Sequence, residues 1–326
     1  MVLADTLTLD AGEWEKGLVL ALLCAIAYDT DNASRQRRFA RMGFVERGSV
    51  NLGISAISGL DAYFLERGDD RIIVFRGSQE AVDWFHNARA GKRRFDGVRV
   101  HRGFADSAGI FKGAFLRRRA LFTGSPNIWL TGHSLGGAVA QLAAYSLALT
   151  GRNIANITTF GAPRVGGPLR WVTPYRSLGL GRVTSRWVND RDFVPRLPFF
   201  VPGIRPDAGW AHTGPQNYID LGSSTVHFGD TRVLFPPAHA VAALAHHPIV
   251  GFGTGETSGY VRNICRLMPA GRRMALQESA DASLRESLDG LARLTDGDAP
   301  PASSLSAFTP VYRRRPTLAE TAIHFR

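Results

Sequence analysis

The chain has 326 residues, 44% hydrophobic and 21% charged, which is the composition of a soluble globular protein long enough for one large α/β domain or two small ones. Its net charge of +11 is carried almost entirely by arginine, because Lys16, Lys92 and Lys112 are the only lysines. Such a surface favours nucleic acids or anionic membranes. No segment resembles a nucleic-acid-binding module, so we expect no nucleic-acid partner.

The first apolar run, residues 17–28, is predicted to be a buried helix. It follows acidic residues instead of a basic segment, so we expect no secretory signal peptide. It is also too short to span a bilayer. We therefore expect a protein without a visible leader or transmembrane helix, either cytoplasmic or exported without a cleavable leader, and its location stays open.

Two strands are predicted at residues 62–65 and 72–75, joined by a turn at 68–70. The second strand runs into Ser78 through Arg-Gly. A strand that ends in glycine and a small hydroxyl residue suits an oxyanion-binding loop, because it offers close backbone approach, an N–H and an O–H donor. An ordinary polar turn is the alternative. The next segment, residues 80–90, is expected to be a short helix that covers an active site, or ordinary core, and its large apolar residues are Val82, Trp84 and Phe85.

The stretch around Ser134 is the most informative part of the chain. Residues 127–131 are a short run of β-forming residues, and an Ala/Leu-rich helical pattern begins at Ala138. Between them, Gly-His-Ser-Leu-Gly fits G-x-S-x-G, the nucleophile elbow, in which the serine sits on a sharp turn above a helix N-terminus. We predict that Ser134 is a catalytic nucleophile; the alternative is a strand–helix turn that merely contains serine.

Further strands are predicted at residues 154–160 and 184–188. This alternation of strands and helices predicts a mostly parallel sheet with helices on both faces, and catalytic loops at the carboxyl ends of its strands. Residues 210–221 are expected to form a peripheral hairpin and residues 260–268 a closing helix. The composition changes at Pro269, so we predict a domain at residues 1–268 and an extension at 269–326, an amphipathic helix followed by a flexible basic tail.

Five motifs occur in an order and spacing that resemble the class 3 lipase family, the fungal-lipase-like branch of the α/β hydrolases. They are IIVFRGS with the following DW, VHRGF, TGHSLGGAVA, TFGAPRVGG and NDRDFVPRLP. The resemblance covers residues 17–267. It implies the α/β-hydrolase fold, with a mostly parallel central sheet flanked by helices.

The resemblance also implies roles for particular residues. Ser134 would be the nucleophile. Asp192, which precedes Val-Pro with one residue between, would be the acid that orients the catalytic histidine, and Asp190 is a weaker candidate because it does not hold that position. Ser78 and the N–H of Leu135 would form the oxyanion hole. Residues 80–90 would be the interfacial lid. We expect neither a metal nor a cofactor.

The sequence does not decide which of two adjacent histidines is catalytic. The family's catalytic histidine lies about as far beyond the aspartate as His246 does, commonly after an aspartate that this chain lacks. We favour His246, with His247 as the alternative and His239 third. His101 and His133 are interpreted as core or supporting residues.

Cys24 and Cys265 are the only cysteines. By themselves they are either a disulfide or two buried thiols. Fungal members of the family join an N-terminal helix to the chain after the catalytic histidine by a disulfide, so the resemblance implies a bridge between them.

These features predict a serine carboxylic-ester hydrolase that cleaves glycerolipid acyl esters at a membrane or droplet surface. The order Ser, Asp, His is that of α/β hydrolases. The charge makes anionic phospholipid a second substrate, as in phospholipase A1. Two alternatives remain: a lipase-like scaffold without activity that binds a membrane or partner protein, and an exported phospholipase toxin or effector.

Overall fold

The computed structural model describes residues 12–54, 59–77, 91–124, 126–190, 192–198, 209–230, 247, 249 and 259–272. Several predictions lie outside these residues and stay predictions. They concern Ser78, the lid with Val82, Trp84 and Phe85, His239, His246 and nearly all of the C-terminal extension.

The described residues build an eight-stranded sheet in the order β1-β2-β3-β6-β7-β8-β9-β10. Its five inner strands from β3 to β9 are mutually parallel, with antiparallel β1 and β2 at one edge and antiparallel β10 at the other. This confirms the predicted α/β-hydrolase architecture. The strands are β1 (Val45–Asn51), β2 (Asp61–Arg67), β3 (Asp70–Arg76), β6 (Asn127–His133), β7 (Ile154–Phe160), β8 (Thr184–Asn189), β9 (Gln216–Asp220) and β10 (Thr225–Asp230).

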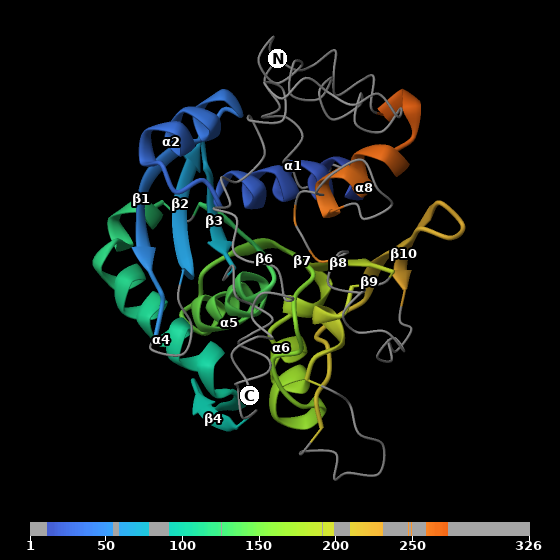
Figure 1. The fold of residues 1–326 in the computed structure, drawn as a ribbon. Coiled ribbons are helices and arrows are strands. Elements are labelled where there is room, and N and C mark those ends of the chain that lie inside the picture. Colours follow the sequence, from blue (N-terminus) through green and yellow to red (C-terminus); the bar gives the residue numbers. More distant parts are fainter. Residues whose placement is uncertain are drawn as a thin grey trace, which may run out of the picture.

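Helices cover both faces of the sheet (Figure 1). In the view of Figure 1, α1 (Glu13–Ile26), α2 (Asn32–Arg41) and α8 (Tyr260–Leu267) lie above the sheet. On the other face lie α4 (Arg102–Arg117), α5 (Leu135–Leu149) and α6 (Thr173–Ser177). Short helical turns are η2 (Arg119–Phe122), η3 (Pro168–Val172), η4 (Leu180–Arg182) and η5 (Val194–Arg196).

Each face of the sheet has its own hydrophobic core, because successive side chains of a strand point to opposite sides. In β3, Ile72 and Val74 pack in the core that contains α1, whereas Ile73 and Phe75 pack in the core that contains α4 and α5. An inner strand must be apolar on both sides to pack in both cores, which is why the centre of β3 is a continuous apolar run.

Helix α1 is buried along ten consecutive residues, from Gly17 to Ile26. It is apolar on all sides, which is typical of a helix enclosed by protein. A Cβ at Gly17 would lie 2.3 Å from the ring of Trp187, so the glycine permits α1 to approach β8. None of the helices among the described residues combines the length and apolarity needed to cross a bilayer.

The basic segment that follows α1 has regular secondary structure. It forms α2, capped by the Asp31 side chain, which accepts a hydrogen bond from the Ser34 N–H, and then the edge strand β1. The polar sequence of β1 hides the strand, because an edge strand is not buried on both faces. The predicted hairpin at 210–221 is also different: β9 joins the main sheet beside β8, and its antiparallel partner is β10.

The disulfide implied by the resemblance is not formed. Cys24 in α1 and Cys265 in α8 are both buried thiols. The Cys24 Sγ lies 3.4 Å from the Thr131 hydroxyl of β6, and burial raises the pKa of this thiol to about 12. Cys24 is therefore directed at the sheet, where it is unreactive.

Candidate active site

The predicted strand–turn–helix around Ser134 is present in the structure. Strand β6 ends at His133 and α5 begins at Leu135, and Ser134 between them has φ 58° and ψ −131°. A positive φ is strained for a residue other than glycine. The flanking glycines make the turn possible: a Cβ at Gly132 would lie 2.5 Å from the Gly136 carbonyl carbon, and one at Gly136 would lie 2.2 Å from the Phe75 oxygen.

Ser134 is completely buried at the carboxyl edge of the sheet. Its N–H donates to the Phe160 carbonyl at 2.9 Å, while its Oγ has no hydrogen-bond partner among the described residues. The N–H of Leu135 belongs to the first turn of α5, where helical N–H groups lack intrahelical partners and the helix dipole is positive. A negative charge that forms beside Ser134 would be stabilised there.

The end of β3 touches the nucleophile elbow. A Cβ at Gly77 would lie 2.5 Å from the His133 carbonyl oxygen and 3.0 Å from the Cβ of Ser134. Glycine at this position therefore lets the two chains approach. The next residue is Ser78, which lies outside the described residues, so its position as an oxyanion donor stays a prediction.

Asp192 follows β8 and is fully buried. Its carboxylate accepts hydrogen bonds from the Val194 N–H at 2.9 Å and from the Tyr260 hydroxyl. The same carboxylate contacts His247 Nδ1, at 3.1 Å through Oδ1 and 3.0 Å through Oδ2. Asp190, the weaker candidate, is engaged elsewhere: its Oδ1 accepts from the Tyr218 hydroxyl on β9.

His247 is the histidine that the structure places on Asp192. A carboxylate only accepts hydrogen bonds, so Nδ1 carries the proton and Nε2 is left as the acceptor. That Nε2 is buried and has no partner among the described residues. The residue that the sequence favoured, His246, lies outside the described residues.

A glycine after β7 makes room for this pair. Gly161 has φ 61°, and a Cβ there would lie 2.8 Å from Asp192 Oδ2 and 3.1 Å from His247 Nδ1. Any side chain at this position would collide with both groups. The glycine of the TFGAPRVGG motif thus leaves space for the Asp192–His247 pair, a role that could not be recognised from the sequence of the motif.

His133 connects the nucleophile elbow to the backbone of His247. Its Nε2 lies 2.7 Å from the His247 carbonyl oxygen, and its Nδ1 lies 2.8 Å from the Tyr28 hydroxyl. A carbonyl only accepts, so Nε2–H donates to it and Nδ1 accepts from Tyr28. Burial, followed by the neighbouring His247, holds the pKa of His133 well below its ordinary value, so the ring stays neutral. The supporting role predicted for His133 is consistent with these contacts.

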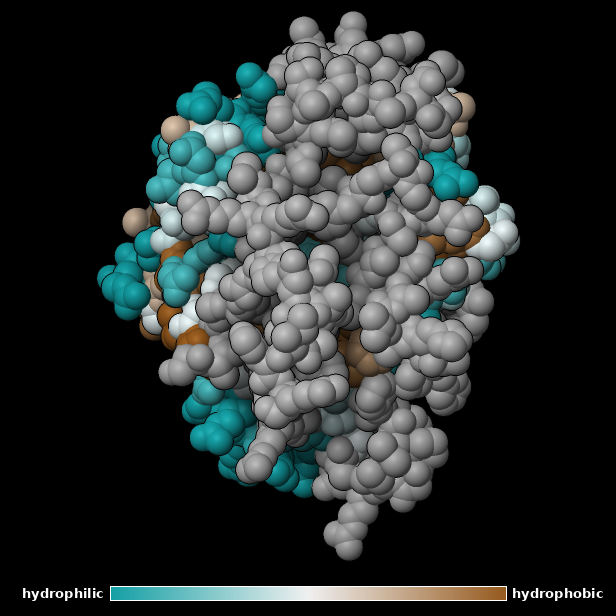
Figure 2. Space-filling model, viewed as in Figure 1, coloured by the Kyte–Doolittle hydropathy of each residue, from teal (hydrophilic) through white to brown (hydrophobic). Residues whose placement is uncertain are grey.

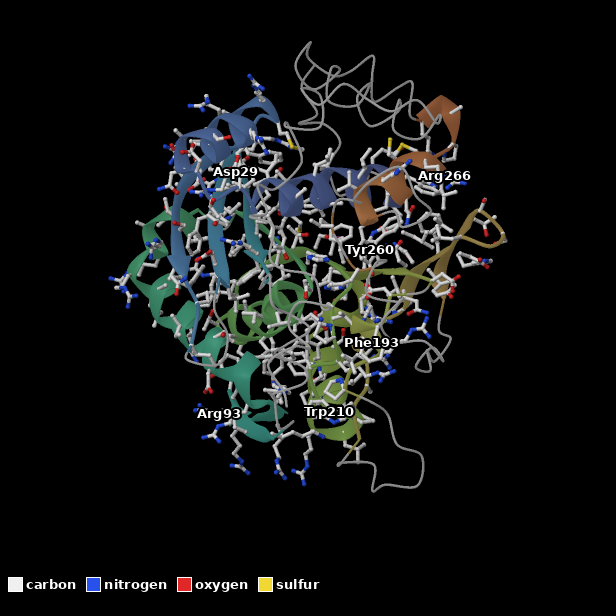
Figure 3. The ribbon with its side chains drawn as sticks, viewed as in Figure 1. Asp29, Arg93, Phe193, Trp210, Tyr260 and Arg266 are labelled. Carbon is white, nitrogen blue, oxygen red and sulfur yellow. The ribbon has the colours of Figure 1, made fainter. Side chains whose placement is uncertain are left out.

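Tyr260 is a functional contact that sequence reasoning missed. It is the first residue of α8 and lies at the centre of the molecule (Figure 3), with its hydroxyl donating to Asp192 Oδ2. Burial, and then the charge of Asp192, raise the pKa of Tyr260 well above its ordinary value, so it remains a donor. The sequence holds no local signal for this bond, because the two residues are 68 positions apart.

The geometry can support acyl transfer: a buried serine, an imidazole whose free nitrogen is an acceptor, and an orienting carboxylate. The described residues contain no group of three or more histidine, cysteine, aspartate or glutamate side chains that could hold a metal ion.

Comparison with known proteins adds independent information. Residues 72–201 match the family model described as lipase (class 3). A secreted mono- and diacylglycerol lipase 1 of Fusarium solani is 35% identical over 188 residues, which cover 54% of this chain and 51% of that protein. The chain spans about half the length of the curated relatives it matches.

Two solved structures resemble the fold. A Rhizomucor miehei triacylglyceride lipase aligns with a TM-score of 0.53 and 27% identity, covering 65% of this chain and 83% of that one. A triacylglycerol lipase whose catalytic centre is described as a serine protease triad aligns with a TM-score of 0.51 and 26% identity, covering 65% and 83%. Residues 72–201 are thus similar to class 3 lipases, and the fold of the chain is similar to that of triacylglycerol lipases, which are α/β hydrolases.

Proposed function

We propose that this chain is a serine carboxylic-ester hydrolase that cleaves acyl esters of glycerolipids. Ser134 is the nucleophile, His247 the general base and Asp192 the group that orients the histidine. The observation that carries the proposal is the buried pair of His247 Nδ1 and the Asp192 carboxylate, 3.0 Å apart, which leaves the His247 Nε2 as an acceptor.

In the first half of the reaction, His247 Nε2 takes the proton of the Ser134 hydroxyl as Oγ attacks the ester carbonyl carbon. The carbonyl oxygen becomes an oxyanion, which the Leu135 N–H and the α5 dipole stabilise. One such donor contributes about 2.7 to 4 kcal/mol to transition-state stability. The hydroxyl of Ser78 is proposed as a further donor.

The tetrahedral intermediate then collapses. His247 gives its proton to the leaving alcohol oxygen, and the acyl group remains bound to Ser134. In the second half, His247 takes a proton from water, the resulting hydroxide attacks the acyl-enzyme, and the fatty acid is released as the proton returns to Ser134. Asp192 stays ionised throughout, because its role is to fix the imidazole tautomer and stabilise the imidazolium.

The substrate class is supported by the relatives. One is named a mono- and diacylglycerol lipase and another a triacylglyceride lipase, and both act on glycerol esters of fatty acids by those names. We propose the same class of ester for this chain, with phospholipid acyl esters as a second class in view of the +11 charge.

Labelling by a fluorophosphonate, together with hydrolysis of p-nitrophenyl and glyceryl esters, tests the proposal. Ser134→Ala should abolish labelling and lower kcat by on the order of 10⁶. Ser107→Ala is the matched control, because Ser107 is also buried, with a hydroxyl that has no partner among the described residues. Absence of labelling in the wild type would support the inactive-scaffold alternative; more than about one thousandth of wild-type activity in Ser134→Ala would refute the assignment.

A further inference from the structure

The small hairpin formed by β4 (Lys92–Phe95) and β5 (Val98–His101) is strongly basic. Between residues 92 and 102 the sequence carries five basic side chains and one acidic side chain. Arg94 of β4 lies directly opposite Arg99 of β5, and both are exposed. Like charges directly opposite each other destabilise a strand pair. The fold by itself therefore gives no reason for two arginines at these positions, which we call the arginine pair.

The carboxylates near the hairpin are engaged by other cations. Asp96, in the turn of the hairpin, accepts from Lys112 of α4 at 2.6 Å. Asp106 of α4 pairs with Arg93. In the part of the chain that the structure describes, neither member of the arginine pair has an ion-pair partner or a side-chain hydrogen bond. Its positive charge is thus not neutralised by these residues.

The other side of the hairpin anchors it to the protein. Phe95, Val98 and Val100 are buried in the core that contains α4 and α5. At the open end, the Lys92 ammonium donates to the Gly209 carbonyl at 2.7 Å and lies 4.4 Å from the centre of the Trp210 ring. Figure 3 shows Arg93 and Trp210 at this end of the molecule, with nitrogen-tipped side chains extending outward from it. The backbone that carries the arginine pair is therefore fixed.

The hairpin is attached to the edge of the sheet that carries the proposed active site. The His101 N–H donates to the Val165 carbonyl at 2.9 Å, and Val100 forms a β-bridge with Gly166. Val165 and Gly166 belong to the loop after β7, and this loop begins at Gly161, which packs against the Asp–His pair. Figure 2 shows hydrophilic residues gathered at the lower left of the visible face, where Figure 1 places β4.

We propose that Arg94 and Arg99 form a docking surface for anionic phospholipid bilayers, which binds lipid phosphates and holds the catalytic edge of the sheet at the membrane. Guanidinium groups match the geometry of phosphate oxygens with two parallel hydrogen bonds. The inference rests on the proposed function, because a substrate ester that resides in a lipid aggregate is the reason to expect a bilayer and not a nucleic acid.

Vesicle flotation of the full chain tests the docking surface without requiring catalysis. All proteins carry Ser134→Ala. The vesicles are phosphatidylcholine alone or phosphatidylcholine with about 30% phosphatidylglycerol, which gives the bilayer a negative surface charge. R94Q/R99Q should weaken partitioning onto the anionic vesicles by roughly 25-fold, since each arginine near an anionic surface contributes about a fivefold factor. Binding of the parent should fall as salt rises.

R37Q/R41Q is the matched control. These arginines are exposed on α2, without ion pairs to the other described residues, and the change lowers the net charge by the same two units. Helix α2 lies at the opposite end of the molecule from β4 in Figure 1. R37Q/R41Q should bind nearly as the parent does. R94K/R99K keeps the charges but cannot form the two parallel hydrogen bonds, so its binding should fall between that of the parent and that of R94Q/R99Q.

Other outcomes overturn the proposal. Equal losses in R94Q/R99Q and R37Q/R41Q would mean that net charge alone attracts the protein, and an unchanged R94Q/R99Q would mean that the pair does not dock. Binding of a DNA duplex through Arg94 and Arg99 without vesicle binding would assign the surface to nucleic acid. Hydrolysis of a water-soluble ester by chains with an intact Ser134 reports on the proposed function separately, and R94Q/R99Q should leave it unchanged.

Discussion

The two halves of the proposed active site are built in different ways. The serine half is one continuous segment, β6 followed by α5, in which Ser134 and its flanking glycines are close neighbours in sequence. The acid–histidine half joins Asp192 to His247, 55 residues away, and to Tyr260, 68 residues away. The first half is a local conformation of the backbone. The second exists only when β8, α8 and the chain at residue 247 have come together.

Because the two halves are built differently, we expect them to respond differently to mutation. The serine half depends on the absence of side chains at positions 132 and 136, because a Cβ at either glycine would collide with neighbouring backbone atoms. Hydrogen bonds across long sequence separations govern the acid–histidine half, so losing one bond can misplace a catalytic group without unfolding the protein. His133 links the halves, because it belongs to β6 and donates to the backbone of His247.

Within the acid–histidine half, the largest expected effect on kcat separates the two adjacent histidines. His247→Ala should lower kcat for a soluble ester by on the order of 10⁴ or more, because the nucleophile loses its base. His246→Ala is the natural control and should retain activity within about tenfold. Steady-state kinetics and the rate of fluorophosphonate labelling measure both. Greater loss in His246→Ala than in His247→Ala would reverse the assignment of the base.

A smaller effect is expected at the link between the halves. His133→Ala should lower kcat by about 10 to 100-fold with little change in KM, because a displacement of about 1 Å in a catalytic group has this consequence. His133→Gln should recover part of the rate, since its amide can still donate to the His247 carbonyl.

His101→Gln is the comparison for His133. His101 is also a buried histidine, with a pKa lowered to about 4 by burial, and its ring packs against Phe104 with centroids 4.4 Å apart. A change there should affect stability and leave kcat unaltered. Equal losses of kcat for both histidines, with no recovery in His133→Gln, would show that His133 contributes to the fold alone.

The smallest effect is expected at Tyr260. Tyr260→Phe removes one donor from Asp192 and leaves the bonds from Val194 and His247, so we expect a decrease in kcat of about tenfold and a loss of about 1 to 3 kcal/mol in the free energy of unfolding. Tyr175→Phe is the control: its hydroxyl bonds to the Thr184 hydroxyl at 2.8 Å in the core. The Tyr175→Phe variant should be less stable than the wild type but have an unchanged kcat. Unchanged kcat in Tyr260→Phe would remove Tyr260 from the catalytic arrangement.

Much of the fold could be read from sequence because its inner strands are unambiguous. Strands β3, β6 and β7 are apolar runs that end in glycine-containing turns, and the helical pattern of α5 follows the elbow at once. Edge elements were harder. Strand β1 is polar and exposed on alternate positions, and β9 was expected in a peripheral hairpin because its place beside β8 depends on pairing across the sheet.

The disulfide shows the limit of resemblance. The resemblance implied a bridge between the two cysteines, but position in sequence does not fix the direction of a side chain. Packing of α1 on β6 points the Cys24 thiol at Thr131. Only the arrangement of α1, α8 and the sheet could decide between a bridge and two buried thiols.

By itself the sequence determined the elbow, a mostly parallel sheet, the resemblance to class 3 lipases and the choice of Ser134 and Asp192 as candidates, because each of these depends on motifs of residues close together in the chain. Tertiary structure decided which neighbouring histidine lies on Asp192, how Tyr260 and His133 hold that pair, and that Arg94 faces Arg99 without a carboxylate among the described residues. The physical reason is common to all three: hydrogen bonds and charges act through distance in space, and the folded sheet alone sets those distances.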